Sequence, residues 1–111
     1  MLKANSVVSL AVLGLLAFVP RIEASERTEA DFIAACTANS NLSPAVCACS
    51  AGKARGELTP DGFSLVVATL EGNDAAAAQL RGKLPIDQLM KAGTFMTRAP
   101  AQCAKASESA G

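Results

Sequence analysis

The sequence predicts an all-α protein, a small bundle of four to five short helices stapled by two disulfides. Helix-start signals recur along the chain, and no segment alternates polar and apolar residues as a half-buried strand would. Half of the residues are hydrophobic, but only 4% are aromatic and much of the remainder is alanine, so the expected core is thin. Four cysteines are therefore expected to supply the stability that a small core lacks.

Residues 1–24 are expected to be a signal peptide that lies outside the fold. Lys3 gives a positive start, Val7–Val19 is an apolar run, and Ala24 suits a signal-peptidase cut. The run is shorter than the roughly 20 residues that a membrane span needs, so an uncleaved anchor is the weaker alternative. We expect a single helical domain over residues 25–105, a frayed tail over 106–111, and a periplasmic or secreted protein that is soluble after cleavage near Ala24.

Capping residues and prolines mark the expected helices. Thr28 and Asp31 are spaced as a capping box, while Ser43 and Thr59 are each followed by a proline at the first helical position. The expected helices cover residues 29 to about 39, 44 to about 55, 60 to about 71, 74 to 81 and 85 to about 98. Three residues are expected to end helices: Gly56, Gly82 and Pro100, the last of which ends its helix or starts a short turn carrying Cys103.

Apolar spacing predicts which helix faces are buried. The helix after Thr59 carries the clearest amphipathic pattern, with apolar residues at i, i+3, i+4 and i+7: Phe63, Val66, Val67 and Leu70. The last helix is expected to bury Ile86, Leu89, Met90 and either Phe95 or Met96.

The segment Cys47-Ala48-Cys49 decides whether the thiols carry chemistry. Residues two apart on an α-helix project roughly 200° apart, so on the helix that starts at Ser43 the two sulfurs face opposite flanks. They then cannot share a metal ion or bond to each other. Each cysteine is expected to find its own partner, and Cys36–Cys47 with Cys49–Cys103 is favoured over Cys36–Cys49 with Cys47–Cys103, because Cys36 and Cys47 flank the same loop. A Cu(I) site that uses Cys47, Cys49 and a methionine (Met90 or Met96) is the less favoured alternative.

Composition argues against several functions. Without histidine there is neither a Ser-His-Asp or Cys-His nucleophile nor a histidine metal ligand. Ten basic and ten acidic residues leave no net charge and no basic stripe, which disfavours nucleic acid as a partner. We therefore expect no enzymatic activity, no catalytic residues, no cofactor and no metal.

The layout Phe-x3-Cys at Phe32–Cys36, Cys-x-Cys at Cys47–Cys49 and Ala-Pro-x2-Cys ending at Cys103 resembles a loose group of small exported bacterial helical proteins. That group is functionally uncharacterised, so the resemblance implies a disulfide-stapled helical fold and no activity. A weaker similarity, carried by the segments CACSAGKARGEL and LPIDQL, is to periplasmic immunity proteins that neutralise toxins. The Gly-Tyr expected after the second cysteine is missing, and the last cysteine is displaced.

These observations favour an exported, non-catalytic module that binds another periplasmic or envelope protein. One alternative is a carrier of small apolar ligands, in which the small residues Ala75–Ala78 and Gly93 would leave a cavity beside Phe63, Val67, Leu89 and Phe95. Further alternatives are an immunity protein and an acid-protective chaperone whose switch would be the protonation of carboxylates such as Asp61 and Glu71.

Overall fold

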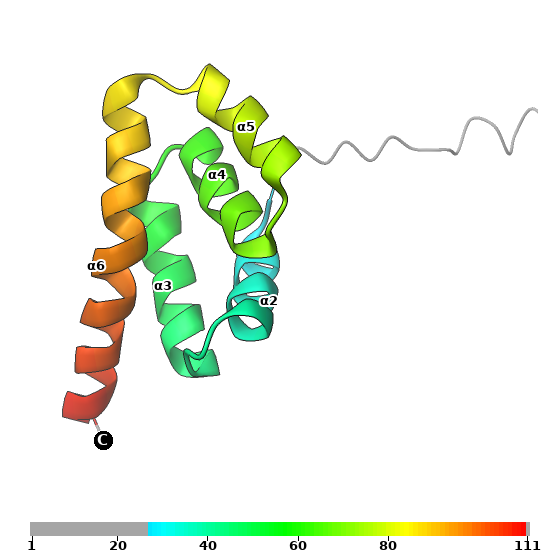
Figure 1. Ribbon diagram of the computed structural model, residues 1–111. Coiled ribbons are helices and arrows are strands. Elements are labelled where there is room, and N and C mark those ends of the chain that lie inside the picture. The colour runs from blue at the N-terminus through cyan, green and yellow to red at the C-terminus, as the bar shows by residue number, and fades with distance from the viewer. Residues whose placement is uncertain (1–26, 111) are drawn as a thin grey trace, which may run out of the picture.

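The computed structural model describes residues 27–110, and this part of the chain contains five helices (Figure 1). They are α2 (Glu29–Asn39), α3 (Pro44–Glu57), α4 (Pro60–Glu71), α5 (Asp74–Lys83) and α6 (Ile86–Ala110). The described residues form no strand, and two disulfides join the helices, so the predicted all-α fold is confirmed. The expected signal peptide lies outside the described residues.

Four helices enclose the core, and the fifth covers one of them. α2 and α6 each pack against both α3 and α4, while α5 packs against α4. α6 runs along one side of the bundle beside α3 (Figure 1). Among residues 27–110, no helix combines the length and the apolar character that a membrane span requires.

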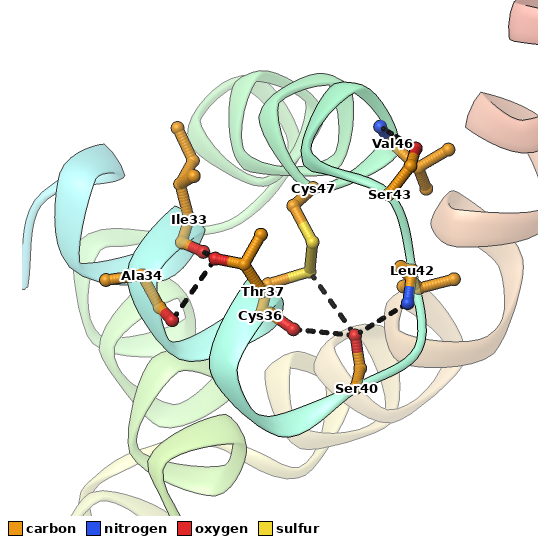
Figure 2. Close-up of a disulfide and its surroundings, with 9 residues drawn as sticks. All are labelled: Ile33, Ala34, Cys36, Thr37, Ser40, Leu42, Ser43, Val46 and Cys47. Atoms are coloured by element: carbon orange, nitrogen blue, oxygen red, sulfur yellow. Dashed lines mark hydrogen bonds between the residues drawn. A yellow bond between two sulfur atoms is a disulfide. The ribbon is translucent and has the colours of Figure 1, made fainter.

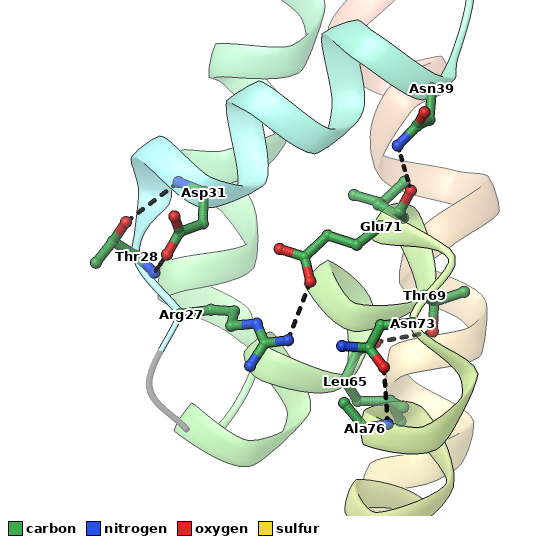
Figure 3. A network of polar contacts seen from close by, with 10 residues as sticks. Arg27, Thr28, Asp31, Asn39, Leu65, Thr69, Glu71, Asn73 and Ala76 are labelled. Atoms are coloured by element: carbon green, nitrogen blue, oxygen red, sulfur yellow. Dashed lines mark hydrogen bonds and ion pairs between the residues drawn. The ribbon is translucent and has the colours of Figure 1, made fainter. Parts of the chain in front are cut away.

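Four of the five predicted helix starts are confirmed, and α6 begins at Ile86, one residue after the predicted start. The Thr28 hydroxyl accepts the Asp31 amide (3.1 Å) and the Asp31 carboxylate accepts the Thr28 amide (2.9 Å), which completes the capping box (Figure 3). The hydrogen bond from the Thr28 backbone amide is the main reason why the pKa of Asp31 is lowered from its ordinary value. Ser43 and Thr59 cap α3 and α4, each with proline in the first turn.

Two predicted helix ends are wrong by a short distance. Gly56 and Gly82 lie inside α3 and α5, and each helix ends one residue later. Gly72, which ends α4, is the described glycine with a positive φ (73°) and thus the one that acts as a left-handed cap. At the other two ends the chain leaves the helix at Leu58 and Leu84, whose side chains are buried in the core. Burial of these leucines, rather than glycine conformation, sets where α3 and α5 end.

Pro100 does not end the last helix. α6 continues through it to Ala110, so Cys103 and residues 106–110 belong to the same helix. Proline in a helix interior costs about 3 kcal/mol because it removes one hydrogen bond and crowds the preceding turn. Ala99 and Cys103, on either side of Pro100, are both buried, and Cys103 is bonded to α3. Packing and the disulfide hold this half of α6 in place and offset the proline.

The core gathers three phenylalanines and many alanines. The Phe32 ring lies 5.8 Å from that of Phe63 and meets that of Phe95 edge-on at 6.4 Å, which are favourable aromatic distances. The predicted face of α4 is confirmed, since Phe63, Val66 and Val67 are buried and Leu70 is partly buried.

The predicted face of α6 is partly wrong. Phe95 is buried, and Leu89 and Met96 are partly buried against the core, but Ile86 and Met90 are exposed (71% and 66%). Ala92, Phe95 and Ala99 set the rotation of α6, and this rotation turns Ile86 and Met90 towards solvent.

Candidate functional site: the disulfides and the exposed surface of α6

Two disulfides connect α3 to two different helices. Cys36 of α2 is joined to Cys47 with 5.8 Å between the Cα atoms, and Cys49 is joined to Cys103 of α6 with 5.9 Å between them. This is the favoured of the two pairings that the sequence left open. The two sulfurs of Cys47-Ala48-Cys49 therefore face different neighbours, as residues two apart on a helix must.

The Cys36–Cys47 bond lies in a closely hydrogen-bonded corner (Figure 2). The Ser40 hydroxyl donates to the Cys36 carbonyl (2.6 Å) and accepts the amide of Leu42 (3.2 Å). Both cysteines are buried. The α2–α3 connection is thus fixed by a covalent bond and by local hydrogen bonds, which indicates a structural role for this pair.

The cysteines are not available as ligands for a soft metal ion. All four cysteines of the chain are consumed in disulfides, so none can act as a thiolate ligand. Within residues 27–110, no group of three or more metal-ligating side chains of the histidine, cysteine or carboxylate type comes together. The methionines named as possible ligands lie elsewhere: Met90 is exposed on α6, and Met96 packs against the core.

Three arginine side chains form ion pairs or a cation–π contact with residues of another element. Arg27, ahead of α2, meets Glu71 at the end of α4 at 3.0 Å (Figure 3). Arg98 of α6 meets Glu57 of α3 at 2.7 Å. Arg55 lies with its guanidinium carbon 4.1 Å from the centre of the Phe63 ring. Each of these contacts joins two different elements, which indicates that these arginines have a structural role.

The two carboxylates considered for an acid switch have different surroundings. Glu71 forms an ion pair with Arg27. Asp61 lies in the first turn of α4, where its negative charge interacts favourably with the helix dipole.

The predicted ligand cavity is not where the sequence placed it. Gly93 faces solvent, and of Ala75–Ala78 only Ala77 is buried. A cavity of about 30 Å³ instead lies at the meeting of α2, α3, α4 and α6, lined by Phe32, Cys36, Leu42, Ser50, Val66, Leu70, Phe95, Met96 and Pro100. Sites for small organic ligands measure roughly 300–1,000 Å³, so this cavity is too small for a lipid or a comparable molecule.

The exposed N-terminal half of α6 is the most distinctive surface. Ile86 and Met90 are one helical turn apart, and they are the large hydrophobic side chains that the described residues leave most exposed. We define the α6 surface as these two residues together with the polar residues of the depression beside them: Ile86, Asp87, Gln88, Met90, Lys91, Thr94 and Arg98.

A second depression continues this surface towards the start of α4. Its lining includes Thr59, Asp61, Lys83 and Pro85, and Gln88 lines both depressions. The Gln88 Oε1 atom is buried and has no hydrogen-bond partner in the structure. Sequence reasoning missed this surface because it assigned Ile86 and Met90 to the core. The available signal was that Ala92, Phe95 and Ala99 already define a buried face at helical spacing.

Comparison with protein-family models, with curated proteins and with solved structures finds no match for this chain. The resemblance to small exported helical proteins therefore stays a prediction.

Proposed function

We propose that this chain is a non-catalytic, exported module that binds another protein of the periplasm or cell envelope through the α6 surface. The observation that carries the proposal is the exposure of Ile86 and Met90 on a helix that is fixed to the bundle elsewhere. The two disulfides support the setting, since such bonds form and persist in oxidising compartments outside the cytoplasm.

Exposed apolar side chains favour association because binding removes them from water. Fully burying a side chain such as isoleucine or methionine contributes roughly 1.5–3 kcal/mol. Protein interfaces place such residues at their centre and polar residues around them. Asp87, Lys91 and Thr94 supply that polar surround here.

The scaffold favours binding by holding this helix rigid. Cys103 anchors α6 to α3, Arg98 is tied to Glu57, and Phe95 is buried in the core. A surface that is already ordered loses little conformational entropy when a partner docks. The non-catalytic part of the proposal rests on the lack of histidine and on the engagement of every cysteine in a disulfide.

Affinity capture with matched variants tests the proposal. The mature protein is used as bait for envelope extract under oxidising conditions, beside the double variant Ile86→Gln/Met90→Gln. The control is Ala75→Gln/Ala78→Gln, which makes a comparable polar change at two exposed sites on α5. We expect one partner to be recovered by the wild type and the control, and at least tenfold less by the α6 variant at unchanged Tm. Equal recovery by all three, or recovery of no partner, would contradict the proposal.

A further inference from the structure

Ser50 carries a buried hydroxyl and lines the small cavity at the meeting of α2, α3, α4 and α6. It lies in the middle of α3, is 1% exposed, and its Oγ makes no hydrogen bond in the structure. Other hydroxyls in these helices donate to their own backbone: Thr69 to the Leu65 carbonyl (2.8 Å) and Thr97 to the Thr94 carbonyl (3.1 Å). Since buried hydroxyls are almost always hydrogen-bonded, Ser50 calls for a partner inside the cavity.

α6, which also lines the cavity, carries a second group that lacks its usual partner. Proline has no N–H, so Pro100 cannot donate to the carbonyl of Met96 as an ordinary residue of α6 would. Met96 and Pro100 both line the same cavity as Ser50. A carbonyl released from the helix ladder in this way is commonly satisfied by a side chain or by an inserted water.

The volume of the cavity matches water rather than an organic ligand. A water molecule needs at least about 10–15 Å³ of cavity measured with a water-sized probe, together with polar partners. The observed 30 Å³ fits one or two water molecules and nothing larger. The remaining lining is apolar, so the polar contacts are confined to the side where α3 and α6 meet.

We propose that this cavity is a hydration site in which an ordered water bridges the Ser50 hydroxyl of α3 and the Met96 carbonyl of α6. The water donates one hydrogen to the carbonyl and shares a second hydrogen bond with the hydroxyl. It replaces the helix hydrogen bond that Pro100 removes, and with the Cys49–Cys103 disulfide it holds the two halves of α6 in one line. Ser50 is thereby a positioning residue for the segment around Pro100.

Water-to-amide cross-relaxation NMR on the mature protein is the direct test. We expect cross-peaks between water and the protons that line the cavity, with the sign given by a water that stays longer than about a nanosecond. These cross-peaks should be lost in Ser50→Val, whose extra methyl group fills the site. A cavity without long-lived water would overturn the proposal.

A double-mutant cycle adds a second, independent readout. Pro100→Ala restores the N–H that the Met96 carbonyl lacks, so the bridging water loses its role. We expect Ser50→Ala to lower Tm by about 4–8 °C more in the wild-type background than in the Pro100→Ala background, the shift that one net hydrogen bond produces in a domain of this size. The cycle also cancels the helix propensity that alanine adds. An equal effect of Ser50→Ala in both backgrounds would contradict the bridge.

Discussion

Removing the Cys49–Cys103 bond is expected to destabilise the protein more than removing Cys36–Cys47. The first bond spans a sequence separation of 54 and the second a separation of 11. In the loop-entropy description these separations correspond to about 4 and about 3 kcal/mol. The longer bond also holds the part of α6 beyond Pro100, which the helix ladder secures less well because of the proline.

Urea unfolding followed by circular dichroism at 222 nm measures both effects. The double variants Cys49→Ala/Cys103→Ala and Cys36→Ala/Cys47→Ala are compared with the wild type at pH 7 without reductant. Since small domains have a net stability of roughly 5–15 kcal/mol, a loss of about 4 kcal/mol brings the first variant close to unfolding at room temperature. A loss below about 1.5 kcal/mol for this variant, or a larger loss for the Cys36–Cys47 variant, would refute the reasoning.

Three further outcomes are expected. Mild reduction should open Cys49–Cys103 first, because Cys49 is partly exposed whereas Cys36 and Cys47 are buried; alkylation and peptide mass mapping would show the order. Gly72→Ala should cost about 1 kcal/mol or more at its positive φ, whereas Gly52→Ala, in the open interior of α3, should stabilise by up to about 1 kcal/mol; the pair is compared by thermal melting. The folded-state pKa of Asp31 is lowered, so its contribution is present above the unfolded pKa of about 3.9 and is lost as the pH falls through the folded value. Tm measured from pH 5 to pH 2 should therefore fall less steeply in Asp31→Asn, and an identical slope would count against the capping carboxylate.

The features that sequence predicts well here depend on neighbouring residues. Thr28, Ser43 and Thr59 act as caps because a side-chain oxygen reaches the amide three residues further along the chain, whatever the remainder of the fold does. The divergence of Cys47 and Cys49 follows from helix geometry alone. These elements could be assigned before any tertiary contact was known.

The features that sequence predicts poorly depend on distant parts of the chain. The rotation of α6 is set by the packing of Ala92 and Phe95 against other helices, and small shifts in that rotation decide whether Ile86 is buried or exposed. The passage of α6 through Pro100 depends on a disulfide to a residue far away in sequence. The candidate surface depends on the first of these effects, the rotation of α6, and local patterns therefore did not locate it.

Mapping the disulfides of the protein purified without reductant tests the central claim, that the neighbouring sulfurs of α3 bond to different helices. Only Ala48 separates Cys47 from Cys49, so both lie in one proteolytic peptide, and the bonds must be assigned by fragmenting the intact linked species or by stepwise reduction with alkylation. The structure predicts Cys36 bonded to Cys47 and Cys49 bonded to Cys103. A direct Cys47–Cys49 bond, free thiols or the crossed pairing would contradict it.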